Sequence, residues 1–99
     1  MASVFSKDVY SSADAVAVTK SDTNDLDGNT LGSTSRACRA LYIGGAGNIK
    51  VTMSKDFAEN GDDSVTVTFN GIVAGTVLPI QVVNVQSTTT TATDIVALF

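Results

Sequence analysis

Short runs of β-branched residues are the feature that most limits what this chain can fold into. Of its 99 residues, 31 are Val, Thr or Ile, and such side chains suit the pleated surface of a strand better than the turn of a helix. In residues 65–69, Val and Phe alternate with Thr, which is the periodicity of a half-buried strand. No stretch shows the periodicity of an amphipathic helix. The pattern therefore predicts an all-β fold.

The alternation of apolar and polar residues predicts six strands. They are residues 14–20, 37–43, 49–54, 64–69, 77–86 and 93–99. The Gly-rich residues 44–48 predict a hairpin turn between the second and third strands, because a phosphate-binding loop would need a helix after it. Asn70 and Gly71 predict another turn. Pro79 lacks an amide donor, so its strand should begin at a sheet edge or a bulge. A change of phase at Val82 predicts a bulge or burial on both faces.

Several short strands with frequent turn signals are typical of a small sandwich or barrel. We expect a β-sandwich, Ig-like or jelly-roll-like, of about six to eight antiparallel strands. Residues 14–99 should form this single domain, and residues 1–13 an extended N-terminal arm that docks on its own domain or on a neighbour. The C-terminal aromatic residue should be tied into a sheet or into a partner. The candidate partner-contact residues are Val4, Phe5, Val9, Tyr10 and Phe99.

Charge and composition argue against several functions. Six basic residues against ten acidic ones give a net charge of −4, which disfavours binding to nucleic acid. No run of about 18 apolar residues could span a membrane. The chain has no His, and Cys38 is the single cysteine, so an imidazole-activated thiolate and an internal disulfide are both absent. Cys38 is expected to be a small buried hydrophobe. We expect no catalysis and no cofactor.

Residues 21–36 predict a long surface loop with a ligand-like acidic stretch. Oxygen-bearing side chains recur in residues 22–29, as a calcium loop would require. However, Leu26 interrupts the series and no Glu closes it, so a solvated loop is favoured over a calcium site and no metal ligand is assigned. Residues 56–63 carry the same ambiguity. Arg36 and Arg39 are expected to pair with acidic loops rather than bind phosphate.

An ordered set of motifs resembles a known family. The motifs are residues 39–52 (Arg-Ala-Leu-Tyr-Ile-Gly-Gly-Ala-Gly-Asn-Ile-Lys-Val-Thr), 65–69 (Val-Thr-Val-Thr-Phe), Gly71, Ala74-Gly75, Leu78-Pro79-Ile80, Val83 and 90–99 (Thr-Thr-Ala-Thr-Asp-Ile-Val-Ala-Leu-Phe). Together they resemble the small head-spike base and capsid-decoration (cement) proteins of tailed bacteriophages and gene transfer agents. Val73 stands where that family usually has Pro, and residues 21–35 and 53–63 are longer than its pattern.

The resemblance implies a structural virion protein of a tailed bacteriophage. Such a β-sandwich decorates or cements the capsid surface in many copies, or serves as the base of a head spike. Its implied partners are the major capsid protein, copies of itself and, for a spike base, a fibre protein. Its implied location is the capsid surface of the virion, after assembly in the host cytoplasm, a reducing compartment that also fits the absence of an internal disulfide.

Two other functions remain open from the residues. β-Sandwiches often carry binding sites on their loops, so a host-surface or carbohydrate-binding module of a phage fibre or spike is the main alternative. Tyr10, Tyr42 and residues 21–36 would form its site, although two Tyr and no Trp give a sugar few aromatic platforms. A small metal-dependent hydrolase is the third hypothesis, and only residues 22–27 favour it.

Overall fold

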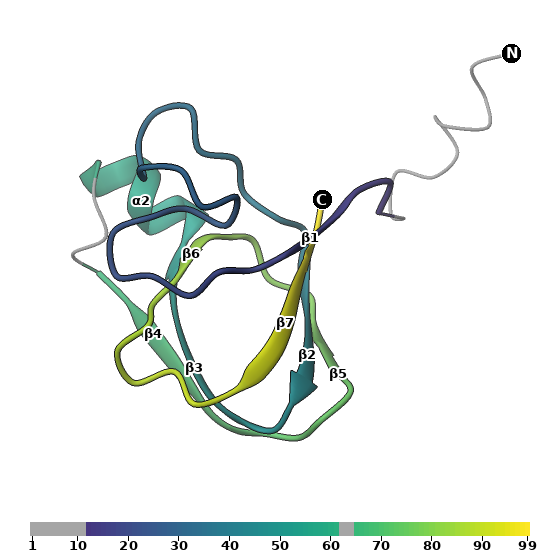
Figure 1. Cartoon of the computed structure of the whole chain (residues 1–99). Helices are drawn as coiled ribbons and strands as arrows, with labels where there is room; N and C mark the ends of the chain where they lie inside the picture. The colour runs from purple at the N-terminus through teal and green to yellow at the C-terminus, as the bar shows by residue number, and fades with distance from the viewer. Residues whose placement is uncertain (1–11, 62–64) are drawn as a thin grey trace, which may run out of the picture.

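Two antiparallel β-sheets lie face to face in the computed structural model, which describes residues 12–61 and 65–99 (Figure 1). In this part of the chain, four strands are ordered β1-β7-β2-β5 and three are ordered β4-β3-β6. The strands are β1 (Ala15–Ala17), β2 (Ala40–Gly45), β3 (Gly47–Met53), β4 (Val67–Ile72), β5 (Thr76–Leu78), β6 (Val82–Val85) and β7 (Thr93–Leu98), and the helix is α2 (Ser54–Asn60). The expected small all-β sandwich is confirmed.

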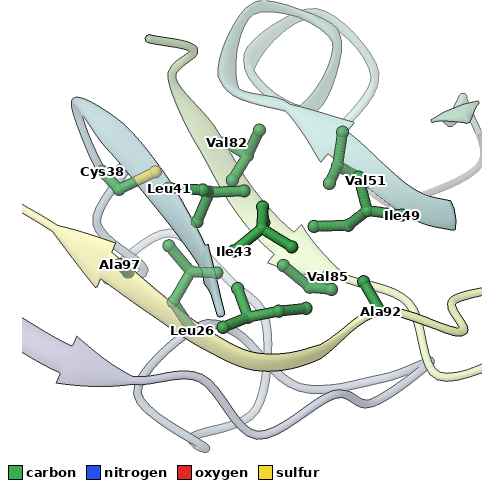
Figure 2. Close-up of a cluster of buried hydrophobic side chains, with 11 residues drawn as sticks. Leu26, Cys38, Leu41, Ile43, Ile49, Val51, Val82, Val85, Ala92 and Ala97 are labelled. Carbon is green, nitrogen blue, oxygen red and sulfur yellow. The ribbon is translucent and has the colours of Figure 1, made fainter. Parts of the chain in front are cut away.

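Aliphatic side chains from both sheets fill the space between them. The four-stranded sheet contributes Leu41, Ile43, Ile95 and Ala97, and the three-stranded sheet contributes Ile49, Val51, Val82 and Val85. Figure 2 shows side chains of both groups lying close together in one cluster. Burying each large aliphatic side chain stabilises the fold by about 1.5–3 kcal/mol. The cluster also includes Leu26 from the loop between β1 and β2, which no strand supplies.

The predicted hairpin at residues 44–48 is wrong. Strand β2 pairs with β5 and β7, whereas β3 pairs with β4 and β6, so these residues carry the chain across from one sheet to the other. Gly47 has a φ of 154°, and a Cβ there would lie 2.5 Å from the backbone nitrogen of Ala92. The glycine therefore permits a close approach of two chain segments rather than a tight turn.

Asn70 and Gly71 lie inside β4 and do not form the predicted turn. The β3–β4 register shifts between Gly47 and Ile49, and Gly71 has a φ of 71°. Its N–H donates to the Asn48 side-chain oxygen at 2.9 Å. A glycine with positive φ at such a shift is the mark of a β-bulge, and a bulge uses the same residue types as a turn.

The predicted strand 77–86 is two strands in different sheets. Strand β5 ends at Leu78, one residue before Pro79, and lies at the edge of its sheet. This agrees with the prediction for Pro79, which has no N–H to donate to a neighbouring strand. Strand β6 is buried along its whole length, and its register with β3 shifts beside Val82. Both interpretations of the phase change at Val82, a bulge and two-sided burial, are therefore confirmed.

Helix α2 is not predicted by the sequence pattern. It has only seven residues, too few to show a helical period, and none of them is buried. Its end carries a recognisable signal: Gly61 has a φ of 73° and donates its N–H to the Phe57 carbonyl, which is the left-handed glycine cap of many helices.

Replacing Gly47 with Ala should destabilise the fold by about 2–4 kcal/mol, because the added methyl group would overlap backbone atoms of residues 91 and 92 that cannot rotate away. Urea unfolding followed by circular dichroism measures this change. Gly32→Ala is the matched control, since a Cβ added there would have only one atom within 4 Å, at 3.9 Å. Equal stabilities of the two variants would contradict the close approach.

Candidate functional site

The predicted partner-contact residues fall in two places. Val4, Phe5, Val9 and Tyr10 lie outside the described residues, so their contacts stay a prediction. Phe99 lies in the described part, where it is partly buried and packs against the hydrophobic core.

Phe99 is held by its own chain. Its N–H donates to the Asp14 carbonyl at 2.8 Å, and the Ser12 hydroxyl donates to its backbone oxygen at 3.0 Å. The Arg36 guanidinium lies over its ring, 3.6 Å from the centroid, which is a cation–π contact. Phe99 is therefore attached to its own chain beyond the end of β7, and its contact with a partner stays a prediction.

Arg36 joins three segments of the chain at this point. Its guanidinium lies 2.8 Å from the Asp14 carboxylate and 3.1 Å from that of Asp27. The hydrogen bonds to Asp27 and then to Asp14 raise the pKa of Arg36. The expected pairing of Arg36 with acidic residues is confirmed, and it fixes the end of the loop beside the C-terminus.

The carboxylate of Asp25 organises the acidic loop. Asp25 is buried, and one of its oxygens accepts hydrogen bonds from the N–H groups of Asp27 at 3.0 Å and Asn29 at 2.9 Å. The other oxygen accepts from the Ser35 hydroxyl at 2.8 Å. Asp often builds turns in this way, so Asp25 acts here as a structural residue of the loop.

Asp22 attaches the beginning of the loop to the segment after β6. Its carboxylate accepts from the N–H groups of Ser87 and Thr88, both at 2.9 Å, and from the Thr88 hydroxyl at 2.6 Å. The hydrogen bond from the Thr88 side chain is the main cause that lowers the pKa of Asp22. Among residues 12–61 and 65–99, no group of three or more His, Cys, Asp or Glu residues could hold a metal ion.

Asn84 binds the same loop from inside the fold. It is fully buried on β6, and its amide nitrogen donates to the backbone carbonyls of Ser21, at 2.9 Å, and Asn24. Its amide oxygen accepts from the Thr52 hydroxyl at 3.3 Å. The start of the loop, residues 21–24, is thus fastened to the sandwich, and Leu26 enters the core two residues after the last of these attachments. No sequence pattern singles out Asn84, since Asn is common in turns.

Cys38 has no catalytic arrangement around it in the described part of the chain. It is 1% exposed, and its thiol donates to the Ile80 carbonyl at 3.5 Å. Burial raises the pKa of the Cys38 thiol, so the group stays protonated and unreactive near neutral pH. The prediction of a small buried hydrophobe is confirmed.

A hollow of about 480 Å³ lies between residues 33–37, α2 and β6. Its lining residues are Ser33, Ser35, Ala37, Ser54, Phe57, Ala58, Gly61 and Val83. This set offers no ionisable side chain for acid–base chemistry. No helix in the described residues is long and apolar enough to cross a membrane.

The residues proposed for sugar binding are spread over the fold. Tyr42 is 40% exposed on β2, opposite Val77 and Val96. Residues 21–24 instead hydrogen-bond to β6 and to the segment that follows it. The described part of the chain therefore does not gather Tyr42 and this stretch of the loop into one site, and Tyr10 lies outside it.

Asn84→Ala should lower the free energy of unfolding by about 2–3 kcal/mol, because it leaves the partly buried carbonyls of residues 21 and 24 without their donor. It should also speed hydrogen exchange of the loop amides. Mass-spectrometric hydrogen exchange and urea unfolding measure both effects. Asn60→Ala serves as control, since its side chain is exposed on α2. Loop exchange at the wild-type rate in Asn84→Ala would contradict this anchoring role.

Asp22 should make stability depend on acid pH. Its pKa is lower in the folded chain than the ordinary value of 3.8, so the carboxylate stabilises the fold above that pH and loses this effect as pH falls through the folded value. Asp22→Asn should therefore be less stable than wild type at neutral pH, with the difference shrinking towards pH 3. Thermal unfolding across pH measures it. A similar profile for Glu59→Gln, an exposed carboxylate on α2, would contradict the assignment.

The comparisons with known proteins point to a capsid. No family model matches the chain, and no curated protein matches it. Among solved structures, it is similar to a chain of the capsid of a native gene-transfer-agent particle computed with C5 symmetry. The TM-score is 0.64 and the identity 28%, over 89% of this chain and 83% of that chain. This likeness supports a protein related to phage or gene-transfer-agent capsids.

Proposed function

We propose that this chain is a structural component of a virion or gene-transfer-agent particle, and that it decorates or cements the capsid surface or forms the base of a head spike in many copies. The likeness to a capsid chain carries the proposal, since it spans 89% of this sequence and 83% of the other. The two chains therefore have comparable lengths, and the fold as a whole is shared rather than one motif.

The chemistry of the described residues is consistent with a structural role. The thiol of Cys38 is buried, and the acidic side chains Asp22, Asp25 and Asp27 each have hydrogen-bond partners within the fold. These groups have partners within the fold, as is expected of a protein that acts through its shape and surface contacts. Weak contacts suffice for such a protein because many copies act together on one particle.

Attachment is proposed to use the N-terminal arm. The domain would comprise residues 14–99 and the arm residues 1–13, whose apolar residues Val4, Phe5, Val9 and Tyr10 would contact the major capsid protein or a neighbouring copy. The Ser12 hydroxyl donates to the backbone oxygen of Phe99, so Phe99 would hold the end of the arm against the domain. A fibre protein would be a further partner at a spike.

Purified particles provide the test. We expect mass spectrometry to find the chain at on the order of tens to hundreds of copies per particle, and a particle reconstruction to place its sandwich on the outside of the shell. Particles made without the gene should still assemble and package DNA, but should lose surface density and break at a lower temperature. Absence of the chain from purified wild-type particles would refute the proposal.

A further inference from the structure

The outer face of the four-stranded sheet is apolar across all four strands. Leu41, Ile43, Ile95 and Ala97 point into the core, so the alternating residues of these strands point outwards. The strand registers place Ala17, Val96, Tyr42 and Val77 in one row across β1, β7, β2 and β5. The next row contains Ala15, Leu98 and Ala40. We call these seven residues the outer apolar face.

The two sheets differ in how their outer sides are covered. On the three-stranded sheet, the outward positions include Lys50 and Thr68, which are paired, and Thr52 and Asn84, which are buried with hydrogen-bond partners inside the fold. On the outer apolar face, Tyr42 is 40% and Val77 52% exposed. A sheet with one side in water normally carries polar residues there, and apolar residues at both phases are typical of a sheet covered on both sides.

The absence of charged side chains on the outer apolar face allows a second copy of the same chain to cover it. The protein carries a net charge of −4, so two copies repel each other over most of their surface. The outer apolar face contains no ionisable group other than the Tyr42 phenol. The next row of outward positions beyond Tyr42 and Val96 contains Gly44 and Asp94, which lie side by side, and Asp94 ends the apolar area there. Two such faces can meet without burying an unpaired charge, which is the costly event at an interface.

The shape of the face is also self-complementary. The strand order places the small residues Ala15 and Ala17 at one edge and Val77 at the other. A two-fold axis along the strands would set β5 of one copy over β1 of the other, so each Val77 would pack on alanines. Tyr42 would pack on the β7 residues Val96 and Leu98. Sheets that pack face to face lie about 10 Å apart, a spacing that such side chains fill.

We propose that copies of this chain associate in solution through the outer apolar face. The inference deepens the proposed function, because it names the surface by which neighbouring copies would meet on a particle, but it concerns purified protein and is tested without particles.

The test compares Val77→Glu with Val73→Glu in the full-length chain. Both substitutions add one negative charge at an exposed valine, but Val73 lies in the connection between β4 and β5, outside the outer apolar face, and is 68% exposed. Val77→Lys adds the opposite charge at the same place. Sedimentation equilibrium over a range of concentrations gives the dissociation constant, and circular dichroism with thermal unfolding shows whether each variant is folded.

We expect the wild type and Val73→Glu to associate alike, and both Val77 variants to dissociate at least roughly tenfold more readily, because each would bury an unpaired charge. A wild-type chain that is monomeric at every concentration would overturn the inference, and so would association that Val77→Glu leaves unchanged or that Val73→Glu weakens equally. None of these negative results would decide the proposed function, because the copy number of the chain on the particle is measured independently.

Discussion

The hydrogen bonds of the buried Asn84 amide support much of this fold. They hold residues 21 and 24 at the start of the loop against β6, and Leu26 reaches the core from the same loop. Burying Leu26 is worth about 1.5–3 kcal/mol, and each hydrogen bond adds about 1 kcal/mol net. These are large contributions for a domain whose total stability should be about 5–15 kcal/mol. A loop that looks exposed in the sequence therefore contributes a side chain to the core.

Local patterns predict the strands better than their pairing. The alternation of residues 93–99 gives the bounds of β7 almost to the residue, because that signal depends only on neighbouring positions. The hairpin prediction at residues 44–48 fails because Gly-rich turns and Gly-rich crossovers look alike. What distinguishes them is the contact of Gly47 with Ala92, more than forty residues away in the sequence. The turn prediction at Asn70 and Gly71 fails for a similar reason, since a bulge and a turn both need positive φ.

The candidate functional features also divide into those that neighbouring residues predict and those that depend on contacts between distant segments. Burial of Cys38 follows from its apolar neighbours, and the pairing of Arg36 from the acidic loop nearby. The positions of the loop carboxylates could not be predicted, because Asp22 meets its partners Ser87 and Thr88 only after the chain folds. The family resemblance rests on residues 36–99, whereas the structural match covers 89% of the chain.

The proposed structural role on a particle needs two different surfaces. One surface must need no partner. The outer side of the three-stranded sheet is of this kind, because the polar groups of Asn84 and Thr52 have hydrogen-bond partners within the chain. The other must gain from contact, as the outer apolar face would, since Tyr42 and Val77 lose exposure only when something covers them. If each contact contributes a few kcal/mol, a single pair of copies associates weakly. On a particle, each pair would add this contact to those that its two copies make with the capsid, so attachment would be firm although each single contact is reversible.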